Sequence, residues 1–252
     1  MTQEKKMAAK IFRPLIPLII LSIILLSLYV TALPTQPVIT PISNETSASV
    51  GIGAESAGDK GGYITTVTLN ASQQNFAWKA YIGNVTGELV LQDTDSNSIY
   101  KWSMDLNAVG NVYISRNGTV TWGGINCSDR GNITAEDDYL GLDSETSKSI
   151  NQTFSTSVHK AFKVSGNDYI ASNCPAISTY VSGASQGPAN EADLFQEVLL
   201  ADSASNLVYM TILEPDQVGF DGGVYDFQAL VAENEGLAIT SPTTYYFYLE
   251  LL

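Results

Sequence analysis

The fold of this chain is constrained most by a succession of short runs rich in β-branched and aromatic residues. Gly, Asn and Asp bound runs such as "GYITTVTLN", "NFAWKAYIG", "GNVYISRNG" and "VYDFQALVA". Runs of this length and composition, separated by turn residues, are typical of β-strands. About ten or eleven of them lie between residues 63 and 252, which predicts an all-β domain built as a two-sheet sandwich of short antiparallel strands.

Three stretches predict local features of this domain. The dipeptide Asn117-Gly118 between "VYIS" and "TVTW" predicts a tight hairpin. The polar stretch 134–153 predicts a marginal helix or a long loop. The terminal run "TYYFYLELL" is apolar on both faces apart from Glu250, so it predicts a strand inside a sheet and beneath a covering layer.

Two segments of the chain resemble each other at an offset of 109 residues. They are "ELVLQDTDSNSIY" at 88–100 and "EVLLADSASNLVY" at 197–209. Either a hairpin was duplicated within the sequence or the same turn chemistry arose twice. Both readings predict a strand, a loop from Asp to Asn, and a returning strand, because Asp and Asn side chains hydrogen-bond nearby backbone amides.

The first of these loops also contains the weak calcium candidates Asp93, Asp95 and Asn97. An EF-hand loop that began at Asp93 would need Gly at position 98 and Glu at position 104, where Ser98 and Met104 stand. Asp95 has no acidic counterpart in the second loop, where Ala204 takes its place. The sequence therefore predicts a turn here, no confident metal site and no cofactor.

The N-terminus predicts export. A basic flank, "MTQEKKMAAKIFR", precedes an apolar run, so residues 1–33 are expected to form a helix that is either a cleaved signal peptide or an uncleaved transmembrane anchor. Residues 11–33 would contact the membrane, and an uncleaved N-terminus would stay in the cytoplasm. Residues 34–62, rich in Pro, Ser, Thr and Gly, predict a stalk or linker before the extracellular β-sandwich domain of residues 63–252.

The charge and the cysteines further limit which partners and which compartment the protein can have. The part after residue 32 has eight basic and twenty-five acidic residues, a net charge of −17, which argues against nucleic acid as a partner. Its two cysteines, Cys127 and Cys174, permit one intramolecular disulfide, which suits an oxidising extracellular setting.

Sugar attachment is the third signal of export. All the N-x-Ser/Thr sequons fall in the first 151 residues, whereas the Asn residues after that position have none. Sequons indicate surface positions in a compartment where glycosyltransferases act. The seven predicted glycosylation sites are Asn44, Asn70, Asn84, Asn117, Asn126, Asn132 and Asn151.

Catalytic signals are weak. The segment "GASQG" at 183–187 matches a nucleophile-elbow pattern, but Pro188 follows it directly and the sole histidine, His159, precedes it. The sequence therefore favours an exported, N-glycosylated cell-surface protein that is structural, adhesive or filament-forming, with other envelope proteins or its own copies as partners. The alternative is an envelope-associated carbohydrate-binding protein or hydrolytic enzyme.

Several phrases resemble a group of uncharacterised archaeal proteins that are exported or membrane-anchored and rich in β-strands. They are "WKAYIGNVTG" at 78–87, "FQEVLL" at 195–200, "YDFQ" at 225–228 and "YYFY" at 245–248. The resemblance implies an archaeal envelope or extracellular setting, and it implies no activity.

Overall fold

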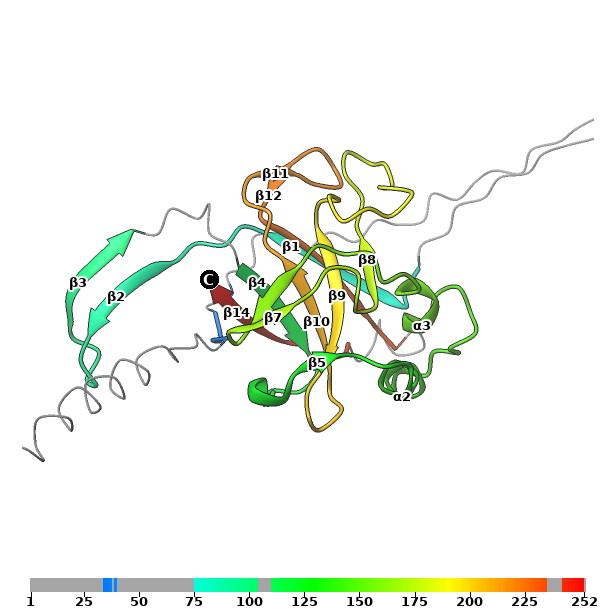
Figure 1. The fold of residues 1–252 in the computed structure, drawn as a ribbon, viewed down its shortest axis with the longest axis horizontal. Helices are drawn as coiled ribbons and strands as arrows, with labels where there is room; N and C mark the ends of the chain where they lie inside the picture. Colours follow the sequence, from blue (N-terminus) through cyan, green and yellow to red (C-terminus); the bar gives the residue numbers. More distant parts are fainter. Residues whose placement is uncertain (1–33, 38, 40–74, 104–109, 235–241, 252) are drawn as a thin grey trace, which may run out of the picture.

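The computed structural model describes residues 34–37, 39, 75–103, 110–234 and 242–251. It shows a mostly β chain with several antiparallel sheets (Figure 1). The predicted signal or anchor of residues 1–33 lies outside the described residues, as do nearly all of the predicted stalk and the sequons Asn44 and Asn70.

A six-stranded antiparallel sheet forms the centre of the molecule. Its strands run in the order β14, β4, β10, β9 and β5, with β8 also paired to β9. Their bounds are Tyr246–Leu251 for β14, Gly110–Ser115 for β4, Leu207–Ile212 for β10, Gln196–Ala201 for β9, Asn126–Cys127 for β5 and Ala176–Ser178 for β8.

Every residue of β4, β9 and β10 is buried, because layers of chain cover both faces of this sheet. Side chains alternate between the faces along each strand. One face carries Ile114, Leu199 and Tyr209, and the other carries Val198 and Met210. Strands buried on both sides need nearly continuous apolar runs, which explains "EVLLA" and "LVYMTI".

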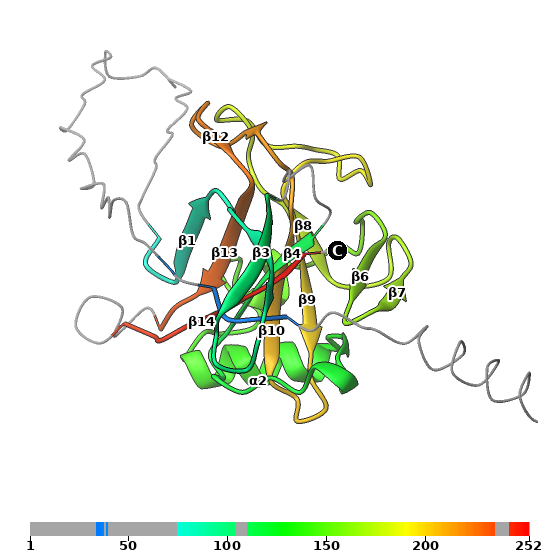
Figure 2. The ribbon, with the colours of Figure 1, turned by 90° about the vertical axis from the view of Figure 1, so that its left-hand side faces the viewer.

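Another antiparallel pair and two helices cover the first face. The pair is β1, Trp78–Gly83, with β13, Phe227–Ala232, and the helices are α2, Arg130–Leu140, and α3, Ile150–Thr153. Figure 2 shows β1 and β13 on one side of the central sheet and α2 at its lower end. Asp137 of α2 accepts hydrogen bonds from the first amides of α3 at 2.7 and 3.1 Å, which ties the helices together.

The second face is covered by the hairpin of β6, Phe162–Val164, and β7, Asn167–Tyr169, together with the segment around the short helix η1, Trp122–Gly124. Two further hairpins form small sheets of their own. They are β2, Glu88–Gln92, with β3, Ser98–Ser103, and β11, Gln217–Val218, with β12, Val224–Tyr225.

The predicted hairpin at Asn117-Gly118 is wrong. The chain turns there, with the Asn117 side chain accepting from the Thr119 amide at 3.0 Å, but "TVTW" forms no strand and leads into η1. The physical reason lies in β4, whose two edges are already paired with β10 and β14. A strand with both edges occupied leaves no donors or acceptors for a returning strand.

The C-terminal run does form a strand, but its predicted place inside the sheet is wrong, because β14 ends the strand order. Residue Thr35 bridges to Leu249 on its outer side. Glu250, the one charged residue on the second face of this run, is 1% exposed. Its carboxylate accepts from the Tyr113 hydroxyl at 2.5 Å and from the Ser165 amide at 2.9 Å, so the sheet buries this charge with partners.

The polar stretch 134–153, predicted as a helix or loop, contains α3 and the last part of α2, which begins earlier, at Arg130. Asp129 caps α2 by accepting from the Asn132 amide, and Gly141 closes it in the left-handed conformation at φ +70°. Glycine adopts that conformation without the steric cost that a Cβ brings, which fixes where α2 ends.

Candidate functional site

The Asp-rich loop at 93–97 is a hydrogen-bonded turn between β2 and β3. Asp93 accepts from the amides of Asp95 and Asn97 at 3.0 and 2.9 Å, and the Asn97 side chain donates to both Asp93 oxygens. These hydrogen bonds hold the pKa of Asp93 below its usual value, and the bond from the Asn97 side chain has the largest effect. The structure thus places the calcium candidates Asp93 and Asn97 in contact with each other, with Asp95 beside them.

The loop at 202–206 between β9 and β10 repeats this turn bond for bond. Asp202 accepts from Ala204 and Asn206 amides at 2.9 and 3.0 Å, and Asn206 donates to both Asp202 oxygens. Ser96 and Ser205 occupy the same left-handed position, at φ 66° and 64°. The predicted turn is confirmed in both hairpins, whereas a common origin of the two segments stays a prediction.

The hairpins differ beyond the turn. A bulge between Leu91 and Gln92 shifts the register of β2 and β3, whereas β9 and β10 pair regularly from Ala201 with Leu207 onward. Asp202 also accepts from the Thr121 amide at 3.2 Å, which ties its turn to the body. Burial alone would raise the pKa of Asp202, but the bonds from Asn206 and the backbone amides outweigh burial and lower it.

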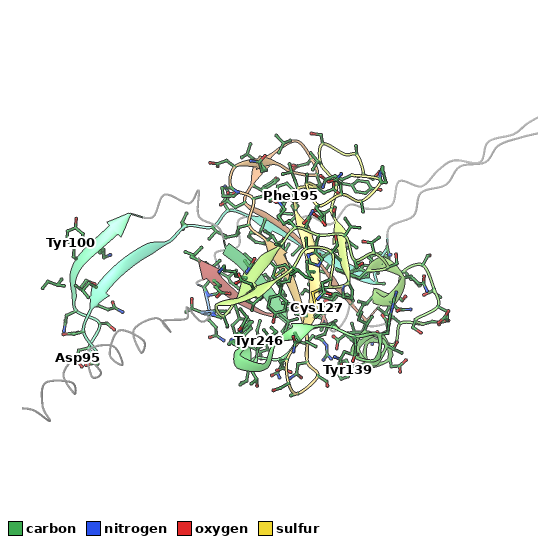
Figure 3. The ribbon with its side chains drawn as sticks, viewed as in Figure 1. Asp95, Tyr100, Cys127, Tyr139, Phe195 and Tyr246 are labelled. Carbon is green, nitrogen blue, oxygen red and sulfur yellow. A yellow bond between two sulfur atoms is a disulfide. The ribbon has the colours of Figure 1, made fainter. Side chains whose placement is uncertain are left out.

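The first hairpin, which we call the arm (residues 88–103), stands away from the body. Figure 1 shows β2 and β3 well to one side of the central sheet, and Figure 3 places Asp95 and Tyr100 at this outer end. Every residue from 91 to 100 is exposed. Among them, Leu91 is 54%, Ile99 80% and Tyr100 58% exposed, so the arm presents large apolar side chains to water.

A second exposed apolar surface lies at the β11–β12 hairpin. We call it the tip surface, and it consists of Tyr180, Val218, Phe220 and Val224. Val218 and Val224 are register partners, and the amide of Gly183 donates to the Phe220 carbonyl at 2.5 Å, which fixes the loop containing Tyr180 against the hairpin. Arm and tip surface occupy different sides of the body (Figure 1).

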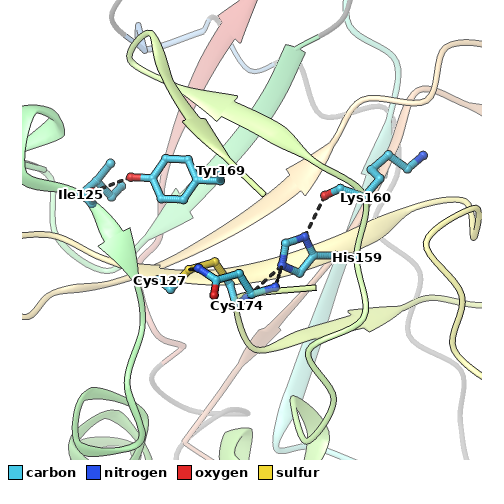
Figure 4. Close-up of a disulfide and its surroundings, with 7 residues drawn as sticks. Ile125, Cys127, His159, Lys160, Tyr169 and Cys174 are labelled. Atoms are coloured by element: carbon cyan, nitrogen blue, oxygen red, sulfur yellow. Dashed lines mark hydrogen bonds between the residues drawn. A yellow bond between two sulfur atoms is a disulfide. The ribbon is translucent and has the colours of Figure 1, made fainter. Parts of the chain in front are cut away.

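The predicted disulfide between Cys127 and Cys174 is confirmed, with 5.0 Å between their Cα atoms. It joins β5 to the segment before β8. His159 lies directly beside it: its Nε2 accepts from the Asn173 and Cys174 amides at 3.0 and 2.9 Å, and its Nδ1 donates to the Lys160 carbonyl at 2.8 Å (Figure 4). The buried imidazole is therefore neutral, and its nitrogens hold the chain next to the disulfide.

A surface groove of about 580 Å³ opens next to the disulfide. Its wall combines the segment around η1 and β5 with β7 and the loop that follows it. The residues that form it are Gly123, Gly124, Ile125, Asn126, Cys127, Asn167, Asp168, Tyr169, Ile170 and Asn173. The groove wall is thus mostly polar, with one aromatic residue, Tyr169, and two large aliphatic residues, Ile125 and Ile170.

The groove wall is held rigidly. The Tyr169 hydroxyl donates to the Ile125 carbonyl at 2.6 Å (Figure 4), and its ring stacks on Phe162 with centroids 4.9 Å apart and planes 8° apart. Asn173 donates from its side chain to the Cys127 sulfur at 3.5 Å. Lys163 and Asp168 form an exposed ion pair at 2.9 Å, which closes the β6–β7 hairpin.

Sequence reasoning missed this groove, although one signal pointed to it. Asn126 and Asn173 each precede a cysteine, so a disulfide between Cys127 and Cys174 necessarily brings the two asparagines near each other. Tyr169 and Asp168 gave no such signal, because their position depends on the β6–β7 hairpin.

The five described sequon asparagines have different surroundings. Asn84 and Asn126 are exposed, and Asn117 and Asn132 are half-buried, the latter in the first turn of α2. Asn151 is half-buried too, and its side chain donates to the Ser144 carbonyl at 3.2 Å and accepts from Arg130. Asn84 and Asn126 are therefore the best exposed of these five sites.

Buried carboxylates outside the groove hold separate parts of the chain together. Glu197 of β9 accepts from the Leu230 amide of β13 at 2.9 Å, across the two sheets, and burial raises its pKa well above the usual value. Glu136 of α2 binds Arg116 through two bonds, at 2.5 and 2.7 Å. Asp226 accepts from the Val85 and Asp216 amides at 2.7 and 3.0 Å. These acids connect layers and loops of the chain.

Within the described ranges, no helix is both long and apolar enough to cross a membrane. In the same part of the chain, no three His, Cys, Asp or Glu side chains gather where they could hold a metal ion. Comparisons of the chain with protein-family models, with curated proteins and with solved structures returned no match.

Proposed function

We propose that this chain is an exported, N-glycosylated cell-surface protein that acts by assembling with further copies of itself rather than by catalysis. The observation that carries the proposal is the arm, a hairpin whose residues 91–100 are all exposed and which includes Leu91 and Ile99. The basic and apolar N-terminal segment, the sequons and the disulfide support a setting outside the cell.

The physics of an isolated hairpin favours a binding role. A two-stranded sheet is marginally stable at best in water, and it gains stability when another layer covers its apolar side chains. The tip surface offers a different apolar surface on the same molecule. A molecule with two such surfaces in separate places can join to its neighbours head to tail, which builds open chains of subunits.

The groups most suited to acid–base chemistry support a non-catalytic role. Both nitrogens of His159 are engaged with the backbone, and Glu197 and Asp226 are buried between layers. The alternative, an envelope protein that binds or hydrolyses carbohydrate, is favoured by one observation, the polar groove beside the disulfide.

Sedimentation of the exported domain tests the assembly. The domain has a large acidic excess, so its copies repel one another at low salt, and we expect association to grow as salt screens that charge. The variant Leu91→Ser/Ile99→Thr should associate at least about tenfold more weakly than the wild type, because two large apolar side chains leave the contact. Ile170→Thr, at another exposed apolar position, is the matched control and should associate normally.

A mixing experiment sharpens the result. The tip variant Val218→Thr/Val224→Thr should also fail to form chains, yet an equimolar mixture of arm and tip variants should form dimers, because one intact arm meets one intact tip surface. Circular dichroism should first show that both proteins are folded. The proposal would then be contradicted if the arm variant associated as strongly as the wild type.

A further inference from the structure

We propose that the groove beside the disulfide seats the glycan carried on Asn126. The inference rests on the proposed export and glycosylation, and it assigns the groove an occupant: the first sugar residues attached to the chain's own Asn126. Asn126 is exposed and is itself part of the groove wall, so a sugar bonded to its Nδ2 begins at the groove.

The chemistry of the wall matches a saccharide. A sugar ring has an apolar C–H face and a rim of hydroxyl groups that both donate and accept hydrogen bonds. Tyr169 and Ile170 supply apolar surface, while Asn167, Asp168 and Asn173 supply amide and carboxylate groups. The volume of about 580 Å³ lies within the range of small-ligand sites, roughly 300–1,000 Å³.

The groove is also preorganised, which lowers the entropy lost when a flexible ligand settles in it. The disulfide fixes β5 against the segment that contains Asn173. Tyr169 is held by its bond to the Ile125 carbonyl and by its stacking on Phe162. His159 fixes the backbone of Asn173. A glycan that lies in this groove would join β5 to the β7 loop and slow local opening of residues 167–173.

The contrast with Asn84 provides a control within the same chain. Asn84 is an exposed sequon on the segment that follows β1, and it does not belong to the groove wall. A glycan there has the same chemistry as one on Asn126 but lacks the groove. A difference in behaviour between the glycans on Asn126 and Asn84 can therefore be assigned to the groove and not to glycosylation in general.

The test uses the exported protein made in a glycosylating eukaryotic secretory host. Peptide mass spectrometry first measures occupancy at each sequon. Native release of the glycans by peptide-N-glycosidase should then be at least about fivefold slower at Asn126 than at Asn84. The groove variant Asn167→Ala/Ile170→Ser should remove that difference. Asn126→Gln should speed amide exchange of residues 167–173, whereas Asn84→Gln should leave it unchanged.

Several outcomes would overturn the inference. The first is an Asn126 without a glycan when the other sequons are occupied. The second is an equal rate of glycan release at Asn126 and Asn84. The third is amide exchange of residues 167–173 that stays unchanged in Asn126→Gln. None of these bears on the arm, whose assembly is measured separately by sedimentation. A protein that fails to assemble yet protects its Asn126 glycan would contradict the proposed self-assembly and leave this inference standing, because the inference needs only export and glycosylation.

Discussion

Removal of the C-terminal strand, residues 246–251, is expected to abolish cooperative folding of the domain predicted at residues 63–252. β14 pairs with β4 over its whole length, and Phe247, Leu249 and Leu251 pack on the core of the first face. Tyr248 is buried on the other face. Tyr248 is buried and the other three are partly buried, so the four side chains contribute at most roughly 6–12 kcal/mol, against the roughly 5–15 kcal/mol that separates a folded domain from its unfolded chain.

Thermal unfolding followed by circular dichroism measures this effect. The milder variant Tyr248→Ala should fold but lose about 3–5 kcal/mol, because it empties a buried aromatic site. Deletion of residues 41–60, in the stalk predicted from the sequence, is the control and should leave the melting temperature nearly unchanged. A truncated domain that still melts cooperatively near the wild-type temperature would show that β14 is dispensable to the core.

Loss of the disulfide is expected to cost about 4 kcal/mol, the chain-entropy value for a closed loop of this length. The bond links residues 47 positions apart. The variant should be Cys127→Ala/Cys174→Ala, because Cys174 is fully buried and a serine hydroxyl would lack a partner there. Urea unfolding with and without reductant measures the change.

Chemical reduction and the double substitution remove the same bond, so the two measurements check each other. Reductant should lower the urea midpoint of the wild type to that of the double variant, and it should leave the double variant unaffected. An unchanged wild-type midpoint after complete reduction, verified by thiol titration, would mean that the core holds these segments without the bond.

Local chemistry was predictable from the sequence where neighbouring residues decide it. The turns at Asp93 and Asp202 are built from side chains and amides within five positions, so the sequence specifies them. The disulfide follows from having two cysteines in a chain with export signals. The start of α2 also has a local origin, since Asp129 caps it, although the polar stretch predicted from the sequence began only at residue 134.

The features that the sequence did not predict depend on contacts between residues far apart in the chain. The segments 88–100 and 197–209 have similar sequences, yet residues 91–100 are exposed whereas the strands β9 and β10 are buried, because β9 and β10 lie inside a sheet and β2 and β3 form a sheet of their own. Glu250 is buried because Tyr113, 137 positions away, donates to it. The groove likewise needs residues from 123–127 and 167–173 together. No local pattern contains these partners.

The central claim, that a doubly covered sheet carries an exposed arm used for assembly, is tested most directly by amide hydrogen exchange. Monomer at low salt should show the slowest exchange in β4, β9 and β10, close to the rate of global unfolding, and fast exchange in β2 and β3. Under assembling salt, exchange in β2 and β3 should slow in the wild type and stay fast in Leu91→Ser/Ile99→Thr. Exchange in β2 and β3 as slow as in β10 in the monomer, or unchanged on assembly, would contradict the account.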